Sequence, residues 1–517
     1  MTWRILATVL SGACMALFAP EWNLHGLQWF MFVPMFWALR EDTPRHNRWL
    51  AFLYGTVAVG SIFWWIVDTV SLFSNIPLPG SIAIHVLFSV AYGLPWLFIW
   101  LLVHPFRERM GSFWVLAMPA WVVLVEYVSG FVLLFPYQQG AVQYRVPQII
   151  QLASVTGVAG ISFLVLWSNC VIAECVYRWR DRGVIPWRHV AAVTSTVAVV
   201  MAFGTYRHDK VEQTLRGADT IRFGQLQSNH GMLWRMDHSA RESFEDWRDL
   251  TQFIPSGEVD LVVWPEGACP YDLNRGPASK RIEKLAKAGG FDMIVGGGTR
   301  ERPAEPEMGE QKVLVFNSTY FIDADGNNRG RYDKMIPLPF GEYLPFSEQF
   351  PWMWEWLEGP GSFRAGEEAV VFDTPSGKIA TPICYEAILS GMCRWFEQPD
   401  MLVNVTNDSW FGGPDSSRHH ATHQHGMLAA LRATELGIPL IRSAYTGVSF
   451  VVEPHGNIYA ETEAYERVQR KVLIRRATVP TLYARFGDWF VGFCLLLVVG
   501  LFRRGIPKVP EKPRWRR

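Results

Sequence analysis

The sequence predicts a membrane α-helical bundle of about eight spans joined to an α/β domain, and three observations support this fold class. Half of the 517 residues are hydrophobic and only 19% are charged, which places the composition on the apolar side of soluble proteins. Long apolar runs fill the first 205 residues, and one more stands near the C-terminus. Between them, short β-type runs alternate with amphipathic stretches, as in α/β domains.

Seven apolar runs precede the polar segment and an eighth follows it. A bilayer core requires about 20 mostly apolar residues for each helix, so we expect eight spans. The runs are Leu6–Phe18, Leu24–Leu39, Trp49–Phe73, Ile82–Val103, Phe113–Phe135, Val146–Tyr177, Val190–Phe203 and Trp489–Phe502. The first run could instead be a signal peptide. However, Arg4 is the only basic residue before it, and further spans follow at once, so we favour a retained helix.

Basic residues are concentrated in alternate connections, and cytoplasmic loops hold such an excess. They lie at 40–48, 107–109, 178–188 and in the tail 503–517, whereas the intervening connections contain a single arginine, Arg145. With the N-terminus inside and seven spans before it, the polar segment should face outward, which in a bacterium is the periplasmic side of the inner membrane. We therefore expect a transmembrane domain over 1–205, a periplasmic domain over 206–485, a C-terminal transmembrane helix over 486–503 and a basic cytoplasmic tail over 504–517.

The periplasmic segment contains candidate strands and helices in alternation. Strands are predicted at Ile221–Gln227, Asp260–Trp264, Met293–Gly297, Asn317–Ile322, Ile379–Cys384, Met401–Val405, Pro439–Arg442 and Val448–Val452. Helices are predicted at Ser239–Phe253, Pro277–Ala288 and His420–Leu436. These helices should pack against the sheet that the strands form.

Charge and cysteine usage exclude several functional classes. The net charge is zero and no large basic surface is evident, so nucleic acid is not expected as a partner. The seven cysteines include no CxxC pair, and no cofactor or metal is predicted. His419, His420, His423 and His425 have helical spacing for a metal, but no acidic third ligand has an obvious place. Cys269, Cys384 and Cys393 lie in the polar segment, where an odd count leaves a thiol unpaired; whether Cys269 and Cys393 pair stays open.

Three segments place reactive side chains at strand ends, where active sites are usually built. They are Val262–Glu266, Tyr332–Lys334 and Thr381–Glu386. Taken singly, each has a plain structural explanation: a surface carboxylate, a solvated lysine and a buried cysteine. Their combination is more specific.

In the order Glu266, Lys334, Cys384, these segments resemble the carbon–nitrogen hydrolase (nitrilase) superfamily over Ile221–Val479. Pro339–Tyr343 and Asn404–Gly412 are further landmarks. The resemblance implies a nitrilase-like αββα sandwich. Over Leu10–Phe502 the chain resembles, more narrowly, the apolipoprotein N-acyltransferase family, with membrane landmarks at Phe18–Pro20, Phe63–Ile66 and Glu126–Pro136.

By this resemblance, Glu266 is the general base, Lys334 stabilises the oxyanion and Cys384 is the nucleophile. Glu342 would orient Lys334 or the attacking amine, and Tyr385, Glu386 and Trp234 would be supporting residues. A thiol has an ordinary pKa near 8.5, so a nearby ammonium and a base are what make it nucleophilic at neutral pH.

The implied reaction moves an acyl chain from a membrane phospholipid, expected to be phosphatidylethanolamine, through a Cys384 thioester. The acceptor would be the α-amino group of the diacylglyceryl-cysteine of an apolipoprotein. A membrane-tethered amidohydrolase with the same triad is the alternative, and a non-catalytic transport or scaffold protein is a third. Seven spans before the domain favour the lipid reaction, since a hydrolase needs no more than one anchor.

Some positions depart from the family pattern or lie outside the triad. Departures at Tyr137, Pro337, Ala444 and Tyr445 could alter donor or acceptor preference. Asp68, Glu126 and Glu174 lie in or beside spans, where an ionisable residue is a functional candidate. The segments Trp352–Pro360 and Phe411–Ser417 are candidate lids, because both carry aromatic residues and glycines.

Overall fold

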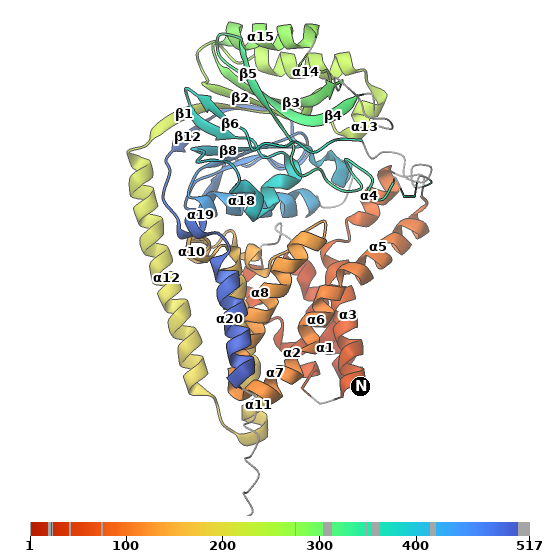
Figure 1. The fold of residues 1–517 in the computed structure, drawn as a ribbon, viewed down its shortest axis with the longest axis vertical. Helices are drawn as coiled ribbons and strands as arrows, with labels where there is room; N and C mark the ends of the chain where they lie inside the picture. Colours follow the sequence, from red (N-terminus) through yellow and green to blue (C-terminus); the bar gives the residue numbers. More distant parts are fainter. Residues whose placement is uncertain are drawn as a thin grey trace, which may run out of the picture.

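The structure, a computed structural model, describes residues 2–18, 22, 24–40, 43–73, 76–274, 276–302, 313–347, 349, 350, 352, 362–413 and 420–504. Figure 1 shows a bundle of helices at one end of the molecule and a layered α/β unit at the other. The bundle comprises α1 (Thr2–Ala13), α2 (Val33–Ala38), α3 (Pro44–Ile62), α4 (Ile66–Phe73), α5 (Leu78–Tyr92), α6 (Leu94–Leu101), α7 (Val103–Met110), α8 (Trp114–Val132), α9 (Pro147–Ile150), α10 (Ala153–Thr156), α11 (Val158–Arg182), α12 (Trp187–Arg216) and α20 (Trp489–Arg504).

Fewer helices than expected meet the length and composition needed to cross a membrane. Among the described residues, the helical stretches Leu78–Val132, Val158–Arg182 and Trp187–Arg216 do so, and Pro44–Ile62 with Ile66–Leu72 makes a fourth if this pair, bent by 58°, is one span. The eight predicted spans are therefore not confirmed. The predicted run Ile82–Val103 and most of Phe113–Phe135 fall within the single stretch Leu78–Val132. The helices α1 and α20 have 12 and 16 residues, shorter than a bilayer core requires.

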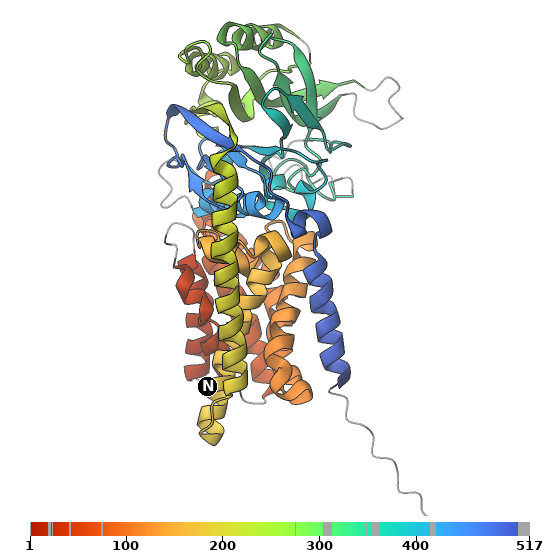
Figure 2. The ribbon, with the colours of Figure 1, turned by 90° about the vertical axis from the view of Figure 1, so that its left-hand side faces the viewer.

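The long helix α12 links the bundle to the α/β unit. It runs for 30 residues along the outside of the bundle and reaches the first strand, as Figure 2 shows from the side. The predicted boundary between residues 205 and 206 falls inside this helix. No residue with a strong helix-breaking tendency lies between 205 and 216, so the polar end simply continues the apolar helix.

Two six-stranded sheets form the α/β unit. The first has the order β12-β1-β2-β3-β4-β5 and the second β11-β10-β9-β8-β7-β6. The strands are β1 (Asp219–Gln227), β2 (Leu261–Cys269), β3 (Asp292–Glu301), β4 (Leu314–Ile322), β5 (Asn328–Asp333), β6 (Val371–Thr374), β7 (Gly377–Ala380), β8 (Met401–Thr406), β9 (Leu440–Ala444), β10 (Phe450–Val452), β11 (Ile458–Tyr459) and β12 (Val468–Arg476). The central pairs β1–β2, β2–β3, β7–β8 and β8–β9 are parallel.

The sheets pack face to face with helices on both outer sides. Along β2, Val263 enters the core between the sheets, whereas Trp264 points to the opposite side and packs against Trp247 of α14 (Ala240–Gln252). This alternation buries both faces of the sheet. Figure 1 shows α14 and α15 (Pro277–Gly289) on the outer sheet and α18 (His420–Leu436) between the other sheet and the bundle. The predicted nitrilase-like αββα sandwich is confirmed.

Most predicted elements are present, with one informative difference. The predicted strand Ile379–Cys384 is too long, because β7 ends at Ala380 and Cys384 begins the 3₁₀ helix η5 (Cys384–Ile388). The edge strands β5, β6, β11 and β12 were not predicted. All seven cysteines are free thiols, so Cys269 and Cys393 are not paired.

Candidate active site

The seam between the two sheets brings together the three reactive segments. Glu266 lies in the irregular end of β2, where the register with β3 shifts between Trp264 and Cys269. Lys334 directly follows β5 of the same sheet, and Cys384 follows β7 of the other sheet. Each sheet therefore contributes part of one site.

Lys334 is held between two carboxylates. Its side chain is 1% exposed, and its Nζ lies 2.6 Å from Glu342 Oε2 and 3.5 Å from Glu266 Oε1. Backbone amides hold the same carboxylates, since Leu338 N donates to Glu342 and Asn407 N donates to Glu266. The lysine cannot turn away without leaving two largely buried anions unpaired.

Asn317, in the middle of β4, was not predicted as a site residue. Its Nδ2 donates to Glu266 Oε1 and to Glu342 Oε1, both at 2.6 Å. One amide group thus spans both carboxylates and fixes their separation around Lys334. An asparagine inside an apolar strand was the available sequence signal, because a buried amide requires partners.

The charges around Cys384 set the state of the thiol. Burial raises the pKa of Cys384, the Glu266 carboxylate raises it further, and Lys334 opposes this rise. Burial would lower the pKa of Lys334, but Glu342 and Glu266 outweigh it and raise the pKa above the ordinary value. The resting site therefore combines an ammonium with a neutral thiol, and the thiol needs a base before it can attack.

The backbone at Cys384 is strained. Its φ is 52°, a left-handed conformation that costs a non-glycine residue about 1–3 kcal/mol. The residue is partly exposed, while its neighbours Ile383 and Tyr385 are buried. This sharp turn presents the thiol at the end of a strand.

Glu386 connects the segment after Lys334 to the turn at Cys384. Its buried carboxylate accepts hydrogen bonds from Tyr332 Oη, from the backbone amides of Met335 and Ile336, and from that of Ile383. Burial raises the pKa of Glu386 to about 7. Glu386 therefore holds the segment after Lys334 and the turn at Cys384 at a fixed distance from each other.

The other predicted supporting residues differ in position. Burial, and to a smaller extent Tyr92 of α5, raise the pKa of Tyr385 to about 12. Trp234 lies in α13 (Met232–Asp237), and its ring is stacked between His230 and His238 at 3.8 and 3.9 Å. In the described part of the chain, these contacts join Trp234 to the two histidines and not to the carboxylate cluster.

Of the departures from the family pattern, Tyr445 turns away from the site. Its Oη accepts a hydrogen bond from Trp247 Nε1 of α14 at 3.1 Å, and the side chain is fully buried. Ala444 donates its amide to Ser449 Oγ. Tyr445 therefore belongs to the outer helix packing.

The ionisable residues of the bundle have separate environments. Glu174 is paired with Arg178 and accepts from Trp114 Nε1, and Glu126 accepts from the Gln139 amide. Asp68 lines a cavity of about 20 Å³ at the junction between α4 and the α/β unit. The candidate lids lie mostly outside the described residues, as does His419.

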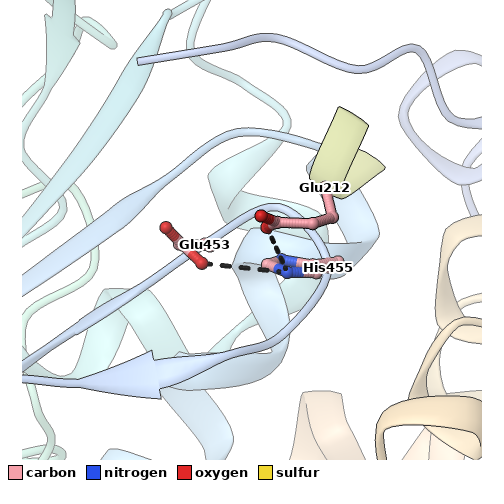
Figure 3. A group of neighbouring side chains, drawn as sticks. All are labelled: Glu212, Glu453 and His455. Carbon is pink, nitrogen blue, oxygen red and sulfur yellow. Dashed lines mark ion pairs between the residues drawn. The ribbon is translucent and has the colours of Figure 1, made fainter. Parts of the chain in front are cut away.

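Two of the four histidines with helical spacing, His420 and His425, have different partners. His420 has edge contacts with Trp22 and Trp64, whereas His425 Nδ1 lies 2.9 Å from Asp408 Oδ1. Among the described residues, the group with metal-ligand proximity is instead Glu212, Glu453 and His455, shown in Figure 3. It lies where α12 meets the loop after β10.

Arg475 of β12 already pairs with both carboxylates of this group. Its guanidinium binds Glu453 at 2.6 and 2.8 Å and Glu212 at 3.0 and 3.1 Å. Burial lowers the pKa of His455 to about 4, so the compensating charge comes from the arginine. The geometry makes this cluster a clamp between α12 and the α/β unit.

Replacing Arg475 with methionine should lower the free energy of unfolding by about 2 kcal/mol, because two charge-assisted pairs are lost and Glu453 stays buried. Chemical denaturation of the detergent-solubilised protein measures this. Arg476→Met is a matched control, since Asp219, the partner of Arg476, is 83% exposed. An equal loss in both variants would contradict the clamp.

Comparison with known proteins gives matches to both halves of the chain. Residues 11–171 match the family described as apolipoprotein N-acyltransferase N-terminal domain, and residues 221–479 match the carbon–nitrogen hydrolase family. An apolipoprotein N-acyltransferase of Geobacter metallireducens is 30% identical over 501 residues, covering 95% of this chain and 93% of the relative. One of Bradyrhizobium diazoefficiens is 32% identical over 412 residues, covering 76% and 74%.

Solved structures resemble the α/β unit only distantly. A carbon–nitrogen hydrolase from Helicobacter pylori G27 is 17% identical, covers 57% of this chain and 96% of its own, and has a TM-score of 0.38. An amidase from Nesterenkonia sp. AN1, with 16% identity, covers 54% and 97% with a TM-score of 0.37.

Proposed function

Because this chain belongs to the apolipoprotein N-acyltransferase family, we propose that it acylates lipoproteins at the membrane through a thioester on Cys384. The acyl chain comes from a membrane phospholipid. It passes to the α-amino group of the N-terminal diacylglyceryl-cysteine of an apolipoprotein.

One observation carries the assignment of roles: a buried lysine between two carboxylates lies beside a strained, partly exposed cysteine. The cluster supports Glu266 as base, Lys334 as oxyanion stabiliser and Cys384 as nucleophile. Glu342 holds Lys334 in place through the 2.6 Å ion pair. A fixed cation close to a thiol that a substrate can reach is the arrangement that acyl transfer requires.

In the first half-reaction, Glu266 takes the proton of the Cys384 thiol as the sulfur attacks the ester carbonyl of the phospholipid. The carbonyl oxygen becomes an oxyanion that the Lys334 ammonium stabilises. Collapse of this intermediate breaks the ester C–O bond, and the leaving lysophospholipid alkoxide takes the proton from Glu266. The products are a thioester and a lysophospholipid.

In the second half-reaction, the amine of the acceptor attacks the thioester carbonyl. Glu266 accepts a proton from the amine and returns it to the departing Cys384 thiolate. An amide bond forms, the thioester bond breaks and the resting enzyme is restored. Two sequential half-reactions through one covalent intermediate predict ping-pong kinetics.

The position of the site relative to the bundle supports a lipid donor. Trp65 of the bundle packs against Phe411, with ring centroids 5.2 Å apart, and its Nε1 donates a hydrogen bond to Gln424 Oε1 of α18. An acyl chain held among the helices would reach the thiol without crossing water, which protects the thioester from hydrolysis. We propose phosphatidylethanolamine as the donor.

The charge distribution supports a periplasmic site in a bacterial inner membrane. Arg40 pairs with Asp181, which joins two of the basic connections. Arg109, in a third basic connection, donates to the backbone oxygen of Phe502 at 3.5 Å, near the end of α20. Figure 1 shows these helix ends on the side of the bundle opposite the sheets. Basic loops favour the cytoplasm, which would leave the sheets outside.

The direct test is mass spectrometry of the purified protein after incubation with phosphatidylethanolamine vesicles. We expect a hydroxylamine-sensitive fatty-acyl adduct on Cys384 that disappears when a diacylated lipopeptide is added. Cys384→Ala should carry no adduct. An adduct that forms on a different residue, or none with any phospholipid, would refute the thioester route and make the amidohydrolase the reaction to test.

A further inference from the structure

A buried ion pair lies immediately behind the proposed nucleophile and takes no direct part in the reaction described above. It joins Arg442 of β9 to Asp408 of η6 (Asp408–Phe411), with Arg442 Nη2 2.7 Å from Asp408 Oδ2. Arg442 is fully buried and Asp408 is 3% exposed. Burying two charges is costly unless both are paired and hydrogen-bonded, so this pair has a specific structural context.

The arginine connects this ion pair to the turn at Cys384. Arg442 Nη1 donates to Asn404 Oδ1 at 2.6 Å, and the Asn404 amide in turn donates to the carbonyl oxygens of Pro382 at 3.0 Å and Cys384 at 3.3 Å. The two carbonyl groups flank Ile383, which lies between β7 and η5. The Asn404 side chain therefore binds the backbone of the strained turn at two points, and Arg442 fixes the orientation of Asn404.

Asp408 is held equally firmly. Thr406 and Thr422 donate their hydroxyl groups to it, and His425 Nδ1 lies 2.9 Å from its Oδ1. A Cβ on Gly447 would lie 2.2 Å from Asp408 Oδ2, so the glycine leaves the space that the carboxylate occupies. The packing allows little movement of this carboxylate.

Asp408 also acts on the thiol through its charge. Burial would raise the pKa of Asp408, but Arg442 and His425 lower it far below the ordinary value, so the carboxylate is ionised at neutral pH. Its charge contributes to the raised pKa of Cys384. The groups around this thiol are Glu266 of β2, Lys334 after β5, Asp408 of η6 and His425 of α18, with Glu342 and Glu386 next to Lys334.

We propose that Arg442 is a positioning residue for Cys384: it fixes Asn404 against the turn and offsets the charge of Asp408 beside the thiol. This inference rests on the proposed function, in which Cys384 forms the thioester. It assigns to one arginine both the geometry of the nucleophile and part of its electrostatic environment.

The test compares four full-length variants in phosphatidylethanolamine vesicles: Arg442→Met, Arg442→Lys, Asn404→Ala and the double variant Arg442→Met/Asp408→Asn. The first measurement is the rate of thioester formation. The second is the pH midpoint of iodoacetamide alkylation, followed on the peptide that contains Cys384 so that the other six cysteines do not contribute.

Arg442→Met should slow thioester formation by about 100-fold, the loss expected from a misplacement of about 1 Å. Its alkylation midpoint should move to higher pH, because an uncompensated Asp408 disfavours the thiolate. Arg442→Lys keeps the charge but lacks the planar fork, so its midpoint should stay near that of the wild type while the rate falls.

The remaining two variants separate the effect of geometry from that of charge. Asn404→Ala should lower the rate without moving the midpoint upward. The double variant should restore the midpoint but not the rate, because both charges are gone and Asn404 is still released.

A loss of thermal stability in Arg442→Met with an unchanged alkylation midpoint and rate would overturn the proposal and leave a purely structural role. If Arg442→Met does not fold, an unchanged rate in both Arg442→Lys and Asn404→Ala would overturn it equally. Failure of the proposed function is distinguishable, because in that case the wild-type protein itself forms no thioester on Cys384.

Discussion

Replacing Lys334 with methionine is expected to slow thioester formation by about 10²–10³-fold, the loss seen when one oxyanion donor is removed from an acyl-transfer site. The lysine is 1% exposed and lies between Glu266 and Glu342. Water therefore cannot enter to stabilise the oxyanion in place of the ammonium unless the site rearranges. Removal of the lysine also leaves the thiol next to unopposed carboxylates. The pKa of Cys384 should rise, and the alkylation midpoint of the thiol should move to higher pH.

The measurement is the burst of lysophospholipid released in a single turnover, which reports the first half-reaction alone. Lys334→Met/Glu342→Gln is the matched control, because it removes one carboxylate together with the lysine and restores the net charge of the site. We expect this control to recover part of the stability and of the alkylation midpoint, but not the burst rate. Recovery of the rate to within threefold would mean that Lys334 only balances charge.

The strands that position these groups could be predicted because their apolar residues are buried on both faces. Leu261–Trp264 is a continuous apolar run and Met401–Val405 is interrupted only by Asn404, a pattern typical of central parallel strands. The edge strands β5 and β12 escaped prediction for the opposite reason. Their sequences, NRGRYD and VQRKVLIRR, are rich in charged residues, because one face of an edge strand meets solvent.

The number of spans could not be read from hydropathy alone. Apolar composition reports burial in either lipid or protein, and the two environments select the same residues. Leu24–Leu39 is apolar, yet it contains only the short 3₁₀ helix η2 (His25–Trp29) and α2, both packed within the bundle. Helix length and breaks depend on tertiary packing, which a hydropathy window does not contain.

The candidate site was predictable because Glu266 and Cys384 come at the ends of apolar runs, and Lys334 completes the set of three reactive residues in the chain order Glu, Lys, Cys. Asn317 and Arg442 were missed as site residues because their importance lies in partners that are distant in sequence. Asn317 binds carboxylates 51 and 25 residues away, and Arg442 binds groups 38 and 34 residues away. The order and register of the strands within each sheet place these partners together: Asn404 of β8 lies opposite Arg442 of β9, and Asn317 and Glu266 lie on β4 and β2 of the other sheet.

Glu266→Gln should make the Cys384 thiol more acidic and, at the same time, slow its acylation. The resting nucleophile is a neutral thiol, so loss of the base should slow thioester formation by about 10³-fold, within the range for general-base catalysis. The carboxylate itself raises the pKa of Cys384, so its removal should lower that pKa. The alkylation midpoint should therefore move to lower pH, opposite to the shift in Lys334→Met.

Two readouts on the same protein test this combination: the lysophospholipid burst and the pH dependence of iodoacetamide alkylation at Cys384. Glu258→Gln is the control, because it makes the same Glu-to-Gln substitution at the surface. Glu258 is 51% exposed, and among the ion pairs of the described residues it pairs only with Lys471. The burst rate of this control should stay within twofold of that of the wild type. A slow burst with a lower alkylation midpoint is the signature of a lost base. If both the burst rate and the midpoint stayed at wild-type values, the proton would leave Cys384 by another route and Glu266 would serve only to hold Lys334, whose ion pair with Glu342 is the shorter of the two.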